Sequence, residues 1–140
     1  MVKRCIDVAA GAILSTKRDH ALLALRQSNQ HQGNLWEFPG GKLEPGEGAL
    51  AALNRELQEE IGISVDEACE LIVVEHDYGD KAVRLHVFAV LSFAGEPTGL
   101  EGQVLKWVPL VELPVYDFPE ANLPIIDALL KRYPCHSENC

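Results

Sequence analysis

The fold is decided by residues 41–63, which read GKLEPGEGALAALNRELQEEIGI. Four apolar side chains of this stretch recur with spacings that form a single stripe on a helix, namely Leu50, Leu53, Leu57 and Ile61. Gly62 follows the stripe and suits the left-handed cap that ends many helices. We therefore expect a helix over residues 49–61 that packs this stripe against the rest of the protein.

Acidic side chains crowd the same region. Six glutamates lie between residues 37 and 63, and these are Glu37, Glu44, Glu47, Glu56, Glu59 and Glu60. Lys42 and Arg55 are the basic residues among them. Glu56 and Glu60 stand one helical turn apart, where like charges repel each other. Two interpretations are open: a solvated acidic face, or a set of carboxylates that holds a divalent cation such as Mg²⁺ or Mn²⁺.

A glycine turn precedes the predicted helix, in the sequence Phe38-Pro39-Gly40-Gly41-Lys42. Glycine has no side chain, so backbone groups at such a turn approach an ion or a phosphate closely. The turn matches neither a P-loop nor a dinucleotide-binding fingerprint. Its position directly before the acidic helix favours the cation interpretation.

The remaining apolar segments predict a sheet. We expect strands over residues 6–14, 21–25, 35–38, 70–75, 83–93 and 105–108. The first two strands form a hairpin. Residues 109–119 contain three prolines and are expected to be irregular. Residues 123–133 predict a closing helix with Ile126, Leu129 and Leu130 inward. The order of strands, helix, strands and helix predicts the α+β class, with a mixed sheet and helices packed on it.

Length, composition and charge narrow the function. The chain has 140 residues, 47% hydrophobic and 24% charged, as expected for one globular domain over residues 1–132 with a short tail over 133–140. A net charge of −9 argues against a nucleic-acid-binding surface and implies that an anionic substrate needs a cation as mediator. No apolar run has the length of a membrane helix, and no secretory signal is visible. The four cysteines form no CxxC pair, which predicts free thiols in a reducing cytoplasm.

The spacing of the charged residues in the stretch 41–63 follows a known pattern. Glu47 comes after Gly41 and five intervening residues, and seven further residues lead to the run from Arg55 to Ile63. This pattern resembles the Nudix box at every defining position. The resemblance implies the Nudix fold, an α/β/α sandwich in which a mixed sheet lies between helices. It also implies a metal-dependent reaction, the hydrolysis of a nucleoside diphosphate linked to a further group.

The same resemblance assigns roles to the acidic cluster. The implied metal ligands are Gly40 through its carbonyl, Glu56, Glu59 and Glu60. Arg55 would orient the glutamates through charge-assisted hydrogen bonds, and Glu47 would steady the loop. We expect Mg²⁺ at this site, with Mn²⁺ as the alternative.

Outside the box, the likeness covers residues 8–131 and is greatest to MutT-type members of the family, which destroy oxidised guanine nucleotides. It rests on the segments 36–42, 95–103 and 117–124. Glu101, in the second of these segments, matches a loop carboxylate that approaches the metal and the attacking water. A solvated glutamate is the alternative for this residue.

The closer resemblance also implies a substrate site. Asn122 would read the purine, because an amide offers a donor and an acceptor together, although an Asn at this position also suits a helix cap. Arg26 and His31 match positions near the sugar and phosphates, and Arg26 is alternatively a surface charge. Phe38 and Lys42, in the segment before the box, are expected to contribute to the same substrate site.

The resemblance and the charge pattern together predict a pyrophosphohydrolase that converts the oxidised guanine nucleotide 8-oxo-dGTP to its monophosphate and pyrophosphate. Such an enzyme would clean the nucleotide pool, protect DNA replication and belong to DNA repair. The expected catalytic residues are Arg55, Glu56, Glu60 and Glu101, and the three glutamates are candidate proton acceptors. Two other functions stay open: hydrolysis of CTP or another nucleoside triphosphate, and a non-catalytic nucleotide-binding module. The expected partner is the nucleotide substrate, without nucleic acid or membrane, and the oligomeric state is left open.

Overall fold

The computed structural model describes residues 4–26 and 34–134. Within them, seven strands form one sheet. The strands are β1 (Arg4–Leu14), β2 (His20–Leu25), β3 (Trp36–Glu37), β4 (Gly40–Lys42), β5 (Ser64–Asp77), β6 (Lys81–Ala94) and β7 (Leu105–Pro109). The helices of the described part are α1 (Ala49–Ile61), α2 (Leu123–Arg132) and the 3₁₀ helices η1 (Leu110–Val115) and η2 (Glu120–Asn122).

The sheet is mixed, with the main strand order β3-β2-β1-β6-β5. β1 runs parallel to β6, whereas the β1–β2, β2–β3 and β5–β6 pairs are antiparallel. β1 changes its partner along its length, since residues 8–10 pair with β4 and residues 13–14 pair with β2. Because β1 pairs with β4 in one part and with β2 in another, the segment from β3 to β4 lies near the centre of the sheet, directly before α1.

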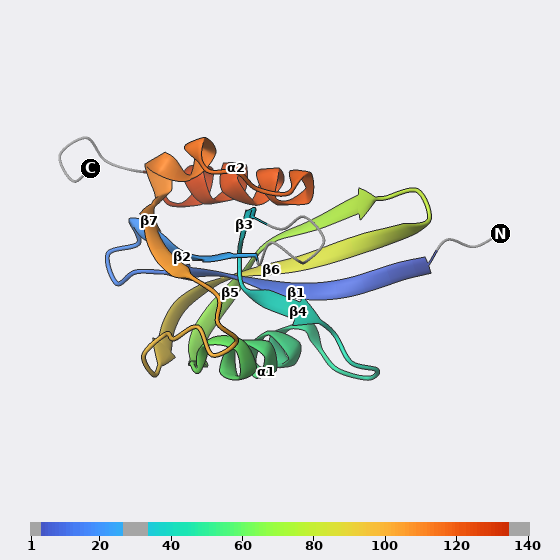
Figure 1. Ribbon diagram of the computed structural model, residues 1–140, viewed down its shortest axis with the longest axis horizontal. Coiled ribbons are helices and arrows are strands. Elements are labelled where there is room, and N and C mark those ends of the chain that lie inside the picture. Colours follow the sequence, from blue (N-terminus) through green and yellow to red (C-terminus); the bar gives the residue numbers. More distant parts are fainter. Residues whose placement is uncertain (1–3, 27–33, 135–140) are drawn as a thin grey trace.

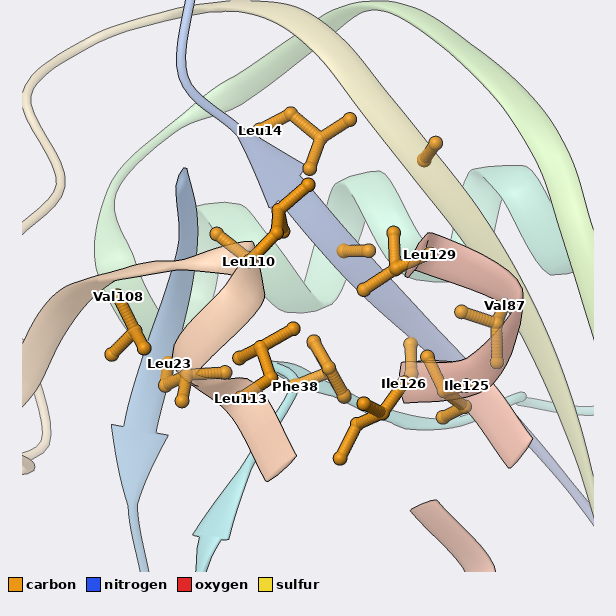
Figure 2. Packing of buried hydrophobic residues seen from close by; sticks show 14 of the residues in the cluster. Leu14, Leu23, Phe38, Val87, Val108, Leu110, Leu113, Ile125, Ile126 and Leu129 are labelled. Atoms are coloured by element: carbon orange, nitrogen blue, oxygen red, sulfur yellow. The ribbon is translucent and has the colours of Figure 1, made fainter. Parts of the chain in front are cut away.

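One α-helix covers each face of the sheet (Figure 1). On one face, Leu53, Leu57 and Ile61 of α1 form a hydrophobic core with Ile13 and Phe88. On the other face, α2 and η1 cover a second and larger core, whose buried side chains are seen in Figure 2. The expected α/β/α sandwich is confirmed.

The helix predicted over residues 49–61 is confirmed as α1, and Gly62 ends it with a left-handed φ of 73°. Three of the four residues in the predicted apolar stripe are fully buried, but Leu50 is 46% exposed, contrary to the prediction. Leu50 has the predicted angle around the helix axis, yet it stands in the first turn, and the buried residues of the helix begin only at Ala52. The packed part of α1 is therefore shorter than the helix itself.

The hairpin of β5 and β6 is longer than its prediction, which covers only residues 70–75 and 83–93. β5 pairs with β6 over its whole length, and three register shifts interrupt this pairing between residues 65 and 72. Such irregularities break the alternation of apolar and polar side chains. The sequence pattern therefore reveals only the regular part of each strand.

The C-terminal part follows its prediction with small changes. Residues 109–119, expected to be irregular, contain the 3₁₀ helix η1. In α2, Ile126 and Leu129 are buried as predicted. Leu130 is only half-buried, while Ile125 is fully buried in the core.

Two of the four cysteines lie in the described part of the chain. Cys5 and Cys69 are free thiols, and Cys135 and Cys140 lie outside the described residues. Within residues 4–26 and 34–134, no helix combines the length and the apolar character that crossing a membrane requires.

Candidate active site

Arg55 joins α1 to the loop in front of it. Its guanidinium makes two parallel hydrogen bonds to Glu47, from Nε to Oε2 at 2.8 Å and from Nη2 to Oε1 at 2.9 Å. Nη1 donates to Glu56 Oε1 at 2.9 Å and to Glu59 Oε2 at 3.5 Å. Nη2 also donates to the backbone carbonyl of Lys42 at 3.1 Å. The guanidinium of Arg55 thus holds two glutamates of the helix and fixes the loop in front of it.

Glu47 is held as a carboxylate. The hydrogen bonds from Arg55, and then the backbone N–H of Glu44 at 2.9 Å, lower the pKa of Glu47 to about 2. The hydrogen bond to Glu47 likewise raises the pKa of Arg55 above its ordinary value. Both groups therefore stay charged at neutral pH, and their pairing keeps the loop attached to the helix.

Glu60 has the opposite environment. Its Oε2 atom is buried and has no hydrogen-bond partner in the described part of the chain. Burial, and then the negative charges of Glu56, Glu101 and Glu37, raise the pKa of Glu60 to about 8. A buried carboxylate among other carboxylates is unfavourable unless a cation neutralises it. This side chain is therefore the clearest indication of a cation site.

Gly40 and Gly41 bring the backbone of β4 against the acidic face of α1. A Cβ atom on Gly41 would collide with the carboxyl group of Glu56. A Cβ atom on Gly40 would collide with the backbone of Ala9 in β1. Glycine is needed at Gly40, where a side chain would push β4 away from β1, whereas a side chain at Gly41 would displace the Glu56 carboxylate from its position.

The carboxylate and carbonyl oxygen atoms of this region are the kind of ligand that binds a divalent cation. Mg²⁺ and Mn²⁺ prefer hard oxygen ligands, and Glu60 Oε2 is a buried oxygen without another partner in the described residues. Within those residues, no three acidic, His or Cys side chains already stand in a ready-made metal-binding arrangement. Arg55 holds Glu56 and Glu59 through hydrogen bonds, so these two expected ligands of α1 are oriented by the guanidinium.

A first cavity, of about 100 Å³, lies beside Glu60, and Glu101 and Gln103 contribute to its wall. The turn that holds Glu101 is tied to α1, because Gln103 Nε2 donates to the Glu60 carbonyl oxygen at 3.2 Å. The Oε1 atom of Gln103 accepts the backbone N–H of Glu101 at 2.9 Å. The fold therefore brings Glu101 to the acidic cluster from a distant part of the sequence.

A second cavity, of about 230 Å³, shares part of its wall with the first and is lined by Phe38, Lys42 and Asn122 among others. Phe38 is nearly buried and stacks on Phe118, with the ring centroids 5.5 Å apart. Asn122 directly precedes α2, but its side chain makes no capping hydrogen bond. Asn122 thus stands at the N-cap position without a side-chain capping bond among the described residues, and it is one of the residues that line the cavity.

The structure brings most of the predicted site residues together. The acidic face of α1 and the two cavity walls contain Arg26, Phe38, Gly40, Lys42, Arg55, Glu56, Glu59, Glu60, Glu101 and Asn122. His31 lies outside the described residues. The sequence prediction gave no site role to Glu37 or Gln103, although both line the first cavity. The sequence feature that could have indicated Glu37 as a site residue is its position as a charged residue between two aromatic residues in a short strand.

Known proteins are similar to this chain in sequence and in fold. Residues 9–128 match the family described as NUDIX domain. The chain is 39% identical over 127 residues to 8-oxo-dGTP diphosphatase of Escherichia coli (strain K12), a match that covers 91% of this chain and 97% of that protein. It is also 34% identical to CTP pyrophosphohydrolase of the same organism, over 91% of this chain and 93% of that one. A solved structure from a study of MutT from Aliivibrio salmonicida and Vibrio cholerae is 35% identical with a TM-score of 0.82, and covers 93% of this chain and 100% of its own. On this basis the chain belongs to the Nudix family of hydrolases.

Proposed function

We propose that this Nudix hydrolase converts 8-oxo-dGTP to 8-oxo-dGMP and pyrophosphate. The observation that carries the proposal is the presence of two cavities with shared walls and different chemistry. One is bordered by Glu60 and Glu101, and the other by Phe38 and Asn122. A nucleotide has the same two-part character, since its phosphates need a cation-filled acidic site and its base needs a flat wall with hydrogen-bonding groups.

The second cavity suits an oxidised purine. The Asn122 amide offers a donor and an acceptor at once, and it makes no helix-capping bond that would compete. Oxidised guanine presents O6 as an acceptor and N7–H as a donor, whereas N7 of ordinary guanine carries no hydrogen. One amide therefore matches the oxidised edge at both atoms and the ordinary edge at only one. Phe38 supplies the apolar wall beside it.

The first cavity suits the phosphates together with a metal, for which we propose Mg²⁺, with Mn²⁺ as a substitute. The proposed ligands are the Gly40 carbonyl, Glu56, Glu59, Glu60 and Glu101, of which Glu60 and Glu101 line the first cavity and Gly40 lines the second. When bound, the metal would neutralise phosphate charge and lower the pKa of the attacking water. Arg55 would keep the glutamates oriented, and Glu56, Glu60 and Glu101 are the candidate proton acceptors. Lys42, Arg26 and His31 are the proposed cationic or polar contacts to the phosphates and sugar.

The products distinguish this reaction from other ways of cleaving a triphosphate. We expect phosphorus NMR of a reaction with 8-oxo-dGTP and Mg²⁺ to show pyrophosphate and the monophosphate in equal amounts. Formation of inorganic phosphate and the diphosphate would contradict the proposal. The variant Glu60→Gln provides the matched control, because it should give neither product while changing a single atom of the site.

A second candidate substrate is CTP, which is supported by the similarity to the CTP pyrophosphohydrolase of E. coli. This candidate keeps the chemistry of the acidic site and changes only the base. Asn122→Ala separates the two, because it should weaken the hydrolysis of 8-oxo-dGTP and leave that of CTP nearly unchanged.

The same proposal gives the protein a place in the cell. Residues 1–132 would act as a single Nudix domain in the cytoplasm, where nucleoside triphosphates await DNA synthesis. Removal of an oxidised nucleotide there would prevent its use in replication and so serve DNA repair.

A further inference from the structure

The loop between β6 and β7, residues 95–104, lies against the C-terminal end of α1 (Figure 1). The last carbonyl groups of a helix have no partner within the helix itself. In α1, the Ile61 carbonyl accepts the backbone N–H of Thr98 at 3.0 Å, and the Glu60 carbonyl accepts that of Leu100 at 3.0 Å. The loop therefore supplies hydrogen-bond donors that the end of the helix requires.

Two glycines let the loop approach the helix and close on itself. Gly95 has a φ of 102°, and a Cβ atom on it would lie 2.7 Å from the Gly62 carbonyl oxygen. A Cβ atom on Gly99 would collide with the carbonyl oxygen of Gln103. Both neighbours are backbone atoms, which cannot move aside as a flexible side chain can. The loop therefore has a defined position on α1.

Gln103 links this loop to the acidic site through both ends of its amide group. Its Nε2 atom donates to the Glu60 carbonyl oxygen at 3.2 Å, and its Oε1 atom accepts the backbone N–H of Glu101 at 2.9 Å. An amide can make this link because it donates and accepts at once. Gln103 thus joins the main chains of Glu60 and Glu101, two of the acidic residues that border the first cavity.

This link opposes an electrostatic repulsion. After burial and the charge of Glu56, the negative charge of Glu101 is the next cause of the raised pKa of Glu60. Like charges at such a site move apart unless another interaction holds them together. The bridge through Gln103 consists of protein atoms alone, so it can form before a cation arrives.

We propose that Gln103 is a positioning residue, which holds Glu101 beside Glu60 so that a divalent cation meets these oxygens already assembled. This inference rests on the proposed function, which makes Glu60 and Glu101 metal ligands. Groups that are fixed in advance lose less conformational freedom when a ligand binds, so the affinity for the ligand is higher. Gln103 also lines the first cavity, and a direct contact with the substrate is therefore the competing role.

The test measures Mn²⁺ binding by spin resonance without any nucleotide. The variant Gln103→Met keeps the length of the side chain and removes both hydrogen bonds. We expect it to raise the Mn²⁺ dissociation constant by about 10-fold, the order of size expected from one or two hydrogen bonds. The same change in a Glu101→Gln background should have almost no effect, because Gln103 acts through the Glu101 carboxylate. An equal loss in both backgrounds, or no loss in either, would overturn the inference.

Gln58→Ala is the matched control. Gln58 lies near the same end of α1, and its Nε2 atom donates to Ser64 Oγ at 2.8 Å. Its replacement removes an amide hydrogen bond of the helix without releasing the loop, so Mn²⁺ binding should stay unchanged. Gln103→Ala is the second variant if Gln103→Met folds poorly.

Kinetics at saturating Mg²⁺ separate positioning from substrate contact. High Mg²⁺ should return kcat and KM of Gln103→Met to nearly the wild-type values, because the metal then fills the site despite its weaker binding. A KM that stays raised would assign Gln103 to the substrate and overturn the inference. The Mn²⁺ titration needs no substrate, so the predicted loss of Mn²⁺ binding together with no hydrolysis of 8-oxo-dGTP would support Gln103 and contradict the proposed function alone.

Discussion

The carboxyl group of Glu60 is buried among other carboxylates, and we therefore expect it to make the stability of the fold depend on pH. Its pKa of about 8 in the folded protein lies above its ordinary value of 4.5, mainly because of burial. The folded state therefore holds this proton more tightly than the unfolded state does. The stabilising effect is complete below pH 4.5 and is lost as the pH rises through 8.

We expect the thermal unfolding midpoint of the wild type, measured in chelator, to decrease as the pH rises from 5 to 8.5. Glu60→Gln has no proton to lose at this position and should show a flatter profile over the same range. Addition of Mg²⁺ at the higher pH should restore the wild type and leave the variant nearly unchanged. Parallel pH profiles of the two proteins would contradict this account of Glu60.

Asn122 is the residue on which base recognition depends. Its side chain lines the second cavity without capping α2. Asn122→Ala should therefore leave the unfolding midpoint almost unchanged and weaken kcat/KM for 8-oxo-dGTP by about 2 kcal/mol, the cost of two unmade hydrogen bonds. Steady-state kinetics with 8-oxo-dGTP and CTP checks this. A matching loss on CTP would show that Asn122 supports the fold of the cavity and does not read the base.

At the scale of elements, the contact between β4 and α1 determines whether the acidic face keeps its geometry. A Cβ atom on Gly41 meets the carboxyl end of the Glu56 side chain, which is flexible. Gly41→Ala should therefore displace Glu56 at little cost to folding, reduce Mn²⁺ binding and lower turnover by about 100-fold or more, as misplacement of a catalytic group does. Spin-resonance titration with Mn²⁺ and steady-state kinetics measure the two effects.

Gly48→Ala is the matched control, because a Cβ atom at Gly48 has open space around it and its φ is −76°. This variant should bind Mn²⁺ and turn over substrate nearly as the wild type does. Unchanged Mn²⁺ binding in Gly41→Ala would contradict the role given to the tight loop.

α1 and β5 show which features of the fold can be predicted from the sequence. Periodicity predicts α1 with its correct bounds, because helical spacing and the Gly62 cap are local features. Leu50 stands in the first turn of α1, before the buried residues of the helix begin, and spacing carries no information about which turns are packed. The register shifts of β5 likewise hide much of that strand.

Some residues of the candidate site can likewise be predicted from the sequence, and others cannot. Arg55 and the helix glutamates are neighbours in sequence, so the box pattern locates them. Glu101 came from the resemblance alone, because the turn that brings it to Glu60 is held by a tertiary contact through Gln103. Glu37 was missed as a site residue because its partner Arg26 is set by the pairing of β2 with β3.

The whole molecule carries a net charge of −9, and its cluster of carboxylates borders the proposed phosphate cavity. Without a cation, a triphosphate would meet a strongly negative site and be repelled. We therefore expect chelator to weaken the binding of a non-hydrolysable nucleoside triphosphate by about 100-fold or more, corresponding to about 2.7 kcal/mol. Equilibrium titration with and without Mg²⁺ measures this, and tight binding that persists in chelator would exclude a metal-mediated site.

The two cavities together select the nucleotide that is hydrolysed. The most direct measurement is kcat/KM with Mg²⁺ for 8-oxo-dGTP, dGTP, dATP, CTP and ADP-ribose, followed as pyrophosphate or phosphate release. We expect 8-oxo-dGTP to be preferred over dGTP by about 100-fold, or about 2.7 kcal/mol, with lower kcat/KM values for the other nucleotides. Equal rates for all the triphosphates, or a maximum at CTP, would contradict the assignment of 8-oxo-dGTP while leaving the Nudix chemistry in place.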